Sequence, residues 1–115
     1  MIPLQITFDI VVNHLRNQGC KAKDEKNVYC SYRGKDGTKC AVGCLIPDDK
    51  YQPDMEEWGS VKNNRFVRDV LIETGHDIEL CSRMQSIHDF GEVWNWEDSF
   101  ESLAEEKHLN YSVPV

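Results

Sequence analysis

The sequence has no long hydrophobic run. No stretch approaches the roughly 18 consecutive apolar residues that a membrane-spanning helix needs. The first residues, MIPLQ, also lack the basic segment and the apolar segment of a secretory signal peptide. We therefore expect a cytoplasmic protein that does not interact with a membrane.

Positive charge is scarce, with 13 Lys and Arg against 20 Asp and Glu and a net charge of −7. Direct binding of nucleic acid needs clustered basic side chains that neutralise phosphates, so the composition argues against it. The imbalance is local, because residues 1–44 hold seven bases and four acids and residues 45–115 hold six bases and sixteen acids. The length of 115 residues predicts a single domain with a basic first part, 1–44, and an acidic second part, 45–115.

Common catalytic fingerprints are missing too. The sequence holds no phosphate-binding loop, nucleophile elbow, His-Glu-x-x-His motif or dinucleotide-binding motif. It therefore predicts no catalytic residue and no cofactor, and it favours a protein that is not an enzyme.

Apolar residues spaced three and four apart predict four amphipathic helices, over 7–18, 61–74, 78–89 and 96–107. Thr7 is the expected N-cap of the first helix, and Asp77 and Asn95 are the expected N-caps of the last two. Gly19 and Gly75 are expected to end the first and second helices.

A Gly-Lys-Asp-Gly turn with alternating apolar and polar residues on both sides predicts a β-hairpin over residues 28–42. A three-residue loop with Gly37 in the left-handed conformation would pair Tyr32 with Cys40 and place the apolar side chains on one face. Two strands alone are marginally stable, so the hairpin needs cover from helices or from a second copy in a homodimer.

An acidic segment follows, and Pro47 and Pro53 exclude a regular helix or central strand across it. We expect an ordered loop over 47–60, with a short helical turn after Asp48, and a frayed tail over 110–115. The predicted fold class is α+β: an N-terminal helix, one β-hairpin, an acidic Pro-bounded loop and three C-terminal helices packed on the hairpin.

The five cysteines are an odd number without an export signal, which indicates free thiols in a reducing compartment. The interpretation we favour is that they are small core residues. The alternative is a zinc site or a cysteine-dependent enzyme that uses Cys30, Cys40, Cys44 and His88. Asp89 follows His88 on a helix, where neighbours point about 100° apart, so it is expected to be poorly placed to orient the imidazole.

Aromatic side chains among acids suit a cationic partner, through cation–π contacts and charge complementarity. Trp58, between acidic residues and a glycine, is the best candidate for an exposed aromatic side chain. The predicted binding residues lie in the loop and in the last helix: Asp48, Asp49, Tyr51, Asp54, Glu56, Glu57, Trp58, Glu97, Asp98, Glu101 and Glu105. The competing interpretation is a solvated acidic surface.

Three segments carry a resemblance: YRGKDGTKCAVGCLIPDDKY at 32–51, PDME at 53–56 and MQSIHD at 84–89. They are similar to a family of small proteins from bacteriophages and bacteria to which no activity is assigned. The resemblance covers about residues 8 to 109 and implies a compact phage-type accessory protein in the host cytoplasm, without supplying a catalytic residue. Together with the acidity, it predicts non-enzymatic binding of a host or phage macromolecule, such as a basic or nucleic-acid-binding protein.

Overall fold

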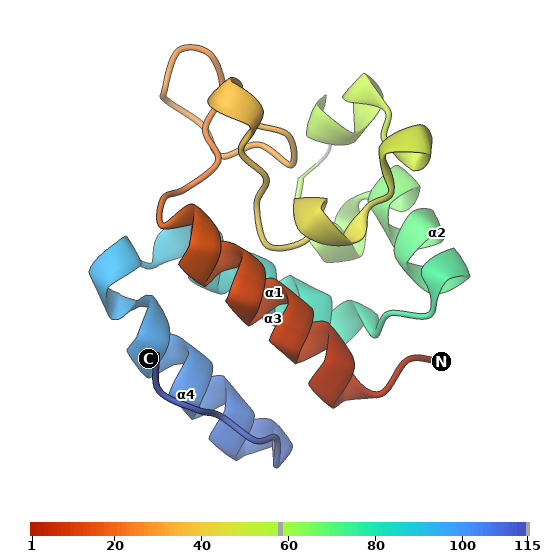
Figure 1. The fold of residues 1–115 in the computed structure, drawn as a ribbon. Coiled ribbons are helices and arrows are strands. Elements are labelled where there is room, and N and C mark those ends of the chain that lie inside the picture. Colours follow the sequence, from red (N-terminus) through yellow and green to blue (C-terminus); the bar gives the residue numbers. More distant parts are fainter. Residues whose placement is uncertain (58, 115) are drawn as a thin grey trace.

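The computed structural model describes residues 1–57 and 59–114, and within them it is built from helices and short turns (Figure 1). The α-helices are α1 (Leu4–Gln18), α2 (Arg65–Thr74), α3 (Ile78–Phe90) and α4 (Trp96–Lys107). Single 3-10 turns join them: η1 (Lys35–Gly37), η2 (Gly43–Leu45), η3 (Asp48–Lys50), η4 (Pro53–Glu57), η5 (Val61–Asn63) and η6 (Val93–Asn95).

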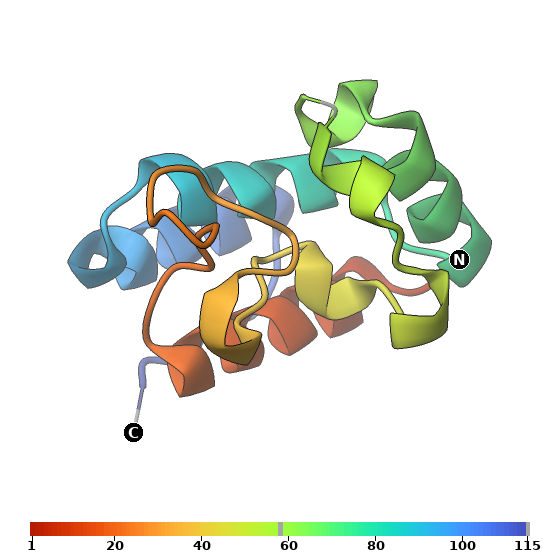
Figure 2. The ribbon, with the colours of Figure 1, turned by 90° about the horizontal axis from the view of Figure 1, so that it is seen from above.

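Helices α1 and α3 run side by side in the same direction, and α4 returns in the opposite direction (Figure 1). The turns η1 to η5 and α2 lie on the other side of this pair from α4, whereas η6 leads directly into α4 (Figure 1). The view from above shows the turns of residues 35–57 placed across α1 and α3 (Figure 2). The core therefore lies between the three long helices and the turns. Its largest fully buried side chains include Phe8, Leu15, Met55, Leu71, Leu80, Met84 and Phe100.

The helix ends were predicted with mixed success. Gly19 and Gly75 adopt left-handed conformations at the ends of α1 and α2, and the Asp77 side chain accepts from the backbone N–H of Leu80, as expected. The prediction for Thr7 is wrong, because α1 begins three residues earlier and the buried Thr7 hydroxyl bonds His76. The side chain of Asn95 makes no capping hydrogen bond to α4.

The predicted β-hairpin is wrong, and with it the α+β fold class. The described residues form an all-α fold, and the segment 28–42 contributes two isolated bridges, Lys23 with Cys30 and Arg33 with Lys39. Gly37 is left-handed and the N–H of Cys40 donates to the carbonyl of Tyr32, so the turn has the expected register without the strands.

In the segment predicted to be a hairpin, side-chain oxygens accept hydrogen bonds from backbone N–H groups that would otherwise pair between strands. The carboxylate of Glu56 accepts from the N–H groups of Tyr32 and Arg33 at 2.9 and 3.0 Å. The amide oxygen of Gln85 accepts from the N–H of Val42 at 2.9 Å. The segment therefore satisfies its buried backbone without pairing into a sheet. Helix α3 packs on α1 and η5, and α2 and α4 pack on α3 and on neighbouring 3-10 turns, rather than on a hairpin.

The prolines act as expected in the acidic segment. Pro47 precedes η3 and Pro53 opens η4, so the 47–57 part of the expected loop consists of two separate 3-10 turns. Searching the described residues for a helix long and apolar enough to cross a membrane finds none.

At Gly43 the backbone of η2 approaches the backbone of Tyr32 closely, and this approach gives a test of how the turns pack. A Cβ atom there would lie 2.0 Å from the carbonyl oxygen of Tyr32. We expect Gly43→Ala to lower the free energy of unfolding by about 3 kcal/mol or more, because backbone would have to shift on both sides. Urea unfolding followed by circular dichroism measures this. Gly59→Ala is the matched control, since among the described residues, its neighbours in the chain apart, no atom lies within 4 Å of the added methyl group. Equal stability of the two variants would contradict the packing of η2 on Tyr32.

Candidate functional site

The C-terminal end of α3 brings a cysteine, a histidine and a carboxylate together. Ligand atoms of Cys30, His88 and Asp89 all lie within 4.8 Å of one another. His88 is fully buried, and its ring stacks on Trp96 with the ring centroids 5.7 Å apart. Cys30 reaches the cluster through the loop after α1. We refer to these three residues as the His88 cluster.

The expectation for Asp89 is wrong. Its Oδ1 lies 2.7 Å from Nδ1 of His88, so it does orient the ring although the two residues are neighbours on a helix. On the other side of the ring, the backbone N–H of Ala22 donates to Nε2 of His88 at 3.0 Å. His88 therefore bonds across to the loop rather than capping the last turn of its own helix.

These two bonds assign the tautomer of His88. Nε2 accepts a hydrogen bond and therefore carries no proton, so the neutral ring carries its proton on Nδ1 and donates it to Asp89. A metal at Nδ1 would require the proton to move to Nε2, where it would face the N–H of Ala22. The Cys30 thiol likewise finds no free lone pair on His88 that could take its proton. The bonding supports a structural role for this histidine.

The other cysteines lie apart from His88 in their bonding. Cys40 is buried, and its sulfur accepts from the N–H of Gly43, while the thiol of Cys44 donates to the carbonyl of Ala41. Of the alternative zinc ligands, the structure thus brings Cys30 and His88 together, and Cys40 and Cys44 have local partners. Among the described residues, the His88 cluster is the one group of three with metal-ligand spacing.

The thiols are held in their protonated form. Burial, followed by the charge of Asp89, raises the pKa of Cys30. Burial also raises the pKa of Cys44 and of Cys81 to about 12. Because the thiolate is the nucleophile and the metal ligand, these environments favour unreactive packing residues.

Three of the predicted binding acids are used inside the molecule. Glu56 holds the Tyr32–Arg33 backbone and also accepts from the hydroxyl of the half-buried Tyr51 at 2.7 Å. Asp48 pairs with Arg33 at 2.6 Å. Glu97 pairs with Arg16, also at 2.6 Å. The charges of Asp48 and Glu97 are therefore matched by arginines, and the oxygens of Glu56 are held by neutral hydrogen-bond donors.

The remaining predicted acids are exposed. Asp49, Asp54 and Glu57 lie on η3 and η4 and have no ion-pair partner within 4.0 Å among the described residues. The same holds for a second group on α4, composed of Asp98, Glu101 and Glu105. The α4 residues are spaced by three and four, so they share one face over about 10 Å. Trp58 lies outside the described residues.

Two large aromatic side chains are exposed where α3 leads into α4. Phe90 is 85% exposed and Trp94 is 78% exposed, whereas Trp96 is buried. The sequence interpretation missed Phe90. A helical projection does carry the signal, because Phe90 falls about 160° around the axis of α3 from the buried His88.

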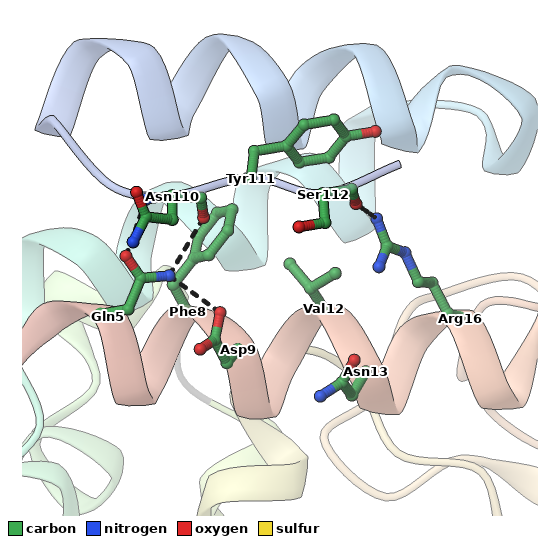
Figure 3. Close-up of a pocket in the computed structure, with 9 residues that line it drawn as sticks. All are labelled: Gln5, Phe8, Asp9, Val12, Asn13, Arg16, Asn110, Tyr111 and Ser112. Atoms are coloured by element: carbon green, nitrogen blue, oxygen red, sulfur yellow. Dashed lines mark hydrogen bonds between the residues drawn. The ribbon is translucent and has the colours of Figure 1, made fainter. Parts of the chain in front are cut away.

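A pocket of about 270 Å³ lies between α1 and the C-terminal tail (Figure 3). The side chain of Gln5 pairs with the backbone of Asn110 in both directions, at 2.7 and 3.0 Å. Arg16 donates to the carbonyl of Ser112, and the Tyr111 hydroxyl donates to Glu97. The tail was expected to fray, but residues 110–112 are bonded along α1 and α4. The polar side chains that line this pocket therefore hold the C-terminal tail against α1 and α4.

Comparisons of the chain with known protein families, with curated proteins and with solved structures find no significant match.

The His88 cluster predicts a stability effect. We expect His88→Phe to lower the free energy of unfolding by about 2–4 kcal/mol, because the ring stack survives while the N–H of Ala22 and the carboxylate of Asp89 lose their partner. Urea unfolding measures this, with His108→Asn, at an exposed left-handed position, as the control. If His88→Phe kept the wild-type stability and abolished the binding of equimolar zinc, the structural assignment would fail.

The tail predicts a pH dependence. Hydrogen bonding from Arg16 lowers the pKa of Glu97 below its ordinary value of 4.5. The stabilisation of the fold by the ionised Glu97 is therefore complete above pH 4.5. It is lost as the pH falls through the lowered pKa of Glu97. We expect Arg16→Gln to cost about 1 kcal/mol near neutral pH, given the partial exposure of the pair, and less in acid. Thermal unfolding across this range measures it. A cost that does not shrink in acid would contradict the role of the pair.

Proposed function

We propose that this protein is a non-enzymatic binding protein that recognises a basic protein through the surface where α3 meets α4. This surface, which we call the corner surface, consists of Phe90, Glu92, Trp94, Asp98, Glu101 and Glu105. Its partner is a host or phage protein if the resemblance to phage proteins holds. The observation that carries the proposal is the exposure of Phe90 and Trp94 just before α4, whose exposed carboxylates have no ion-pair partner among the described residues.

The energetics of protein interfaces support this assignment. Exposed large aromatic side chains are uncommon on proteins without partners, and tryptophan is among the residues that contribute most to interface affinity. Trp94 lies in η6, immediately before α4, so an exposed aromatic side chain and the acidic residues of α4 are close in the chain. Cations bind such aromatic faces, and nearby carboxylates steer basic surfaces towards them.

The alternative function, a metal protein or cysteine-dependent enzyme, has less support. Cys30 and His88 meet, but both nitrogens of His88 are hydrogen bonded, and burial together with the charge of Asp89 raises the pKa of Cys30. The corner surface, in contrast, is accessible as it stands. We therefore take the binding function as the conclusion.

Capture from bacterial lysate by the immobilised protein tests the proposal, with quantification of each retained protein. We expect a basic protein that is retained at low salt and released at high salt, because charge complementarity is screened by ions. Trp94→Ala and Glu101→Lys should each lower its retention about tenfold.

The controls make the same changes on another helix. Ile72→Ala and Asp69→Lys alter an exposed apolar and an exposed acidic residue of α2, and both should keep wild-type retention. Equal losses from the α2 and corner variants would show nonspecific charge attraction. Failure to retain any basic protein at low salt would reject the proposal.

A further inference from the structure

A second pocket lies beside the corner surface, against one face of α3. It has a volume of about 260 Å³. Ser82, Gln85, Ser86 and Asp89 form one wall, because spacings of three and four bring them onto one side of the helix. Residues 59–61 line the opposite side, and the exposed Phe90 belongs to the lining. We call this the Asp89 pocket.

The carboxylate of Asp89 is the charged group of the pocket. It is 27% exposed and accepts from His88 and from Gln85, each at 2.7 Å. These donors hold the carboxylate in place without cancelling its charge, since His88 is neutral in the assigned tautomer. No Lys or Arg nitrogen of the described residues lies within 4.0 Å of it. The chain's own Lys21 donates to the backbone carbonyl of Asp89 instead, at 3.3 Å.

The lining determines which ligand chemistry fits. An anion would be repelled by Asp89, and a metal ion would compete with the hydrogen bonds of His88. A primary ammonium group has three donors and no acceptor, so it needs several oxygen acceptors around one point. The Asp89 carboxylate and the Ser82 and Ser86 hydroxyls are such acceptors on one wall. The ring of Phe90 adds an aromatic surface suited to a cation and its alkyl chain.

We propose that the Asp89 pocket binds the ammonium group of a lysine side chain presented by a basic protein partner. The lysine supplies one anchor point next to Phe90 and Trp94, so recognition combines a pocket with an aromatic surface. This inference rests on the proposed function for the protein that carries the lysine, whereas the pocket itself can be tested without that partner.

The test is a titration of ¹⁵N-labelled protein with lysine blocked at both its amino and carboxyl ends, followed by NMR. We expect saturable shifts at the amides of residues 59–61 and 82–90. The same compound acetylated on Nζ should cause none, because it has lost its charge. Asp89→Asn should weaken binding about tenfold, since it removes the charge and keeps the shape.

Two further variants keep the test decisive. Ser86→Leu fills the pocket from an exposed position without touching the His88 cluster, so it should abolish the shifts even if Asp89→Asn perturbs the fold. Asp69→Asn removes an exposed acid on α2, away from the pocket and the corner surface, and should leave the shifts unchanged. Shifts from the acetylated compound, shifts that survive Ser86→Leu, or no saturable shift at all would overturn the inference.

The two proposals fail in different ways. If the blocked lysine binds but no basic protein is retained by the corner surface, the proposed function fails and the pocket stands. If a basic protein is retained equally by wild-type protein and by Ser86→Leu, the corner surface stands and the lysine anchor fails.

Discussion

The fold depends on a chain of hydrogen bonds along α3 whose centre is His88. The imidazole accepts from the backbone of Ala22 and donates to Asp89, and Asp89 also accepts from Gln85, which in turn accepts from the backbone of Val42. One helix thereby satisfies buried backbone groups of two separate loop segments. In a low-dielectric interior such a network is costly to leave incomplete, so it specifies how the loops lie on the helices. It replaces the sheet that would otherwise order residues 28–42.

The acidic side chains divide into two classes with different consequences. Glu56, Asp48 and Glu97 hold the turns and the tail, each by an ion pair or hydrogen bonds to groups far away in sequence. Others, on η3, η4 and α4, face solvent without an ion-pair partner within the described part of the chain. The acidic residues behind the net charge of −7 therefore include some that hold segments of the fold together and others that are exposed and unpaired. The unpaired acids are available to a partner, and those on α4 follow the exposed Phe90 and Trp94 in the chain.

The helices were predictable because their signals are local. The 3.6-residue period, Asp77 at an N-terminus and left-handed glycines at the ends act within one or two turns of chain, so the predicted ranges nearly match α1, α3 and α4. The hairpin was not predictable, because alternation in 28–42 shows which side chains are buried and not what the backbone bonds. That choice was made by Glu56 and Gln85, which are 23 and 43 residues away from the groups they bind.

The candidate sites show the same division. By itself, the sequence determined the helices, the absence of a catalytic motif, the acidic second part and the likeness of Cys30 and His88 to metal ligands. Only the tertiary structure decided that His88 is bonded on both sides, that Trp94 is exposed, and that Asp89 stands in a pocket with no Lys or Arg nitrogen of the described residues within 4.0 Å. The physical reason is the distance along the chain over which each interaction acts. Periodicity and capping are set by neighbours along the chain, whereas hydrogen-bond partners, burial and unmatched charge are set by whichever segments packing brings together.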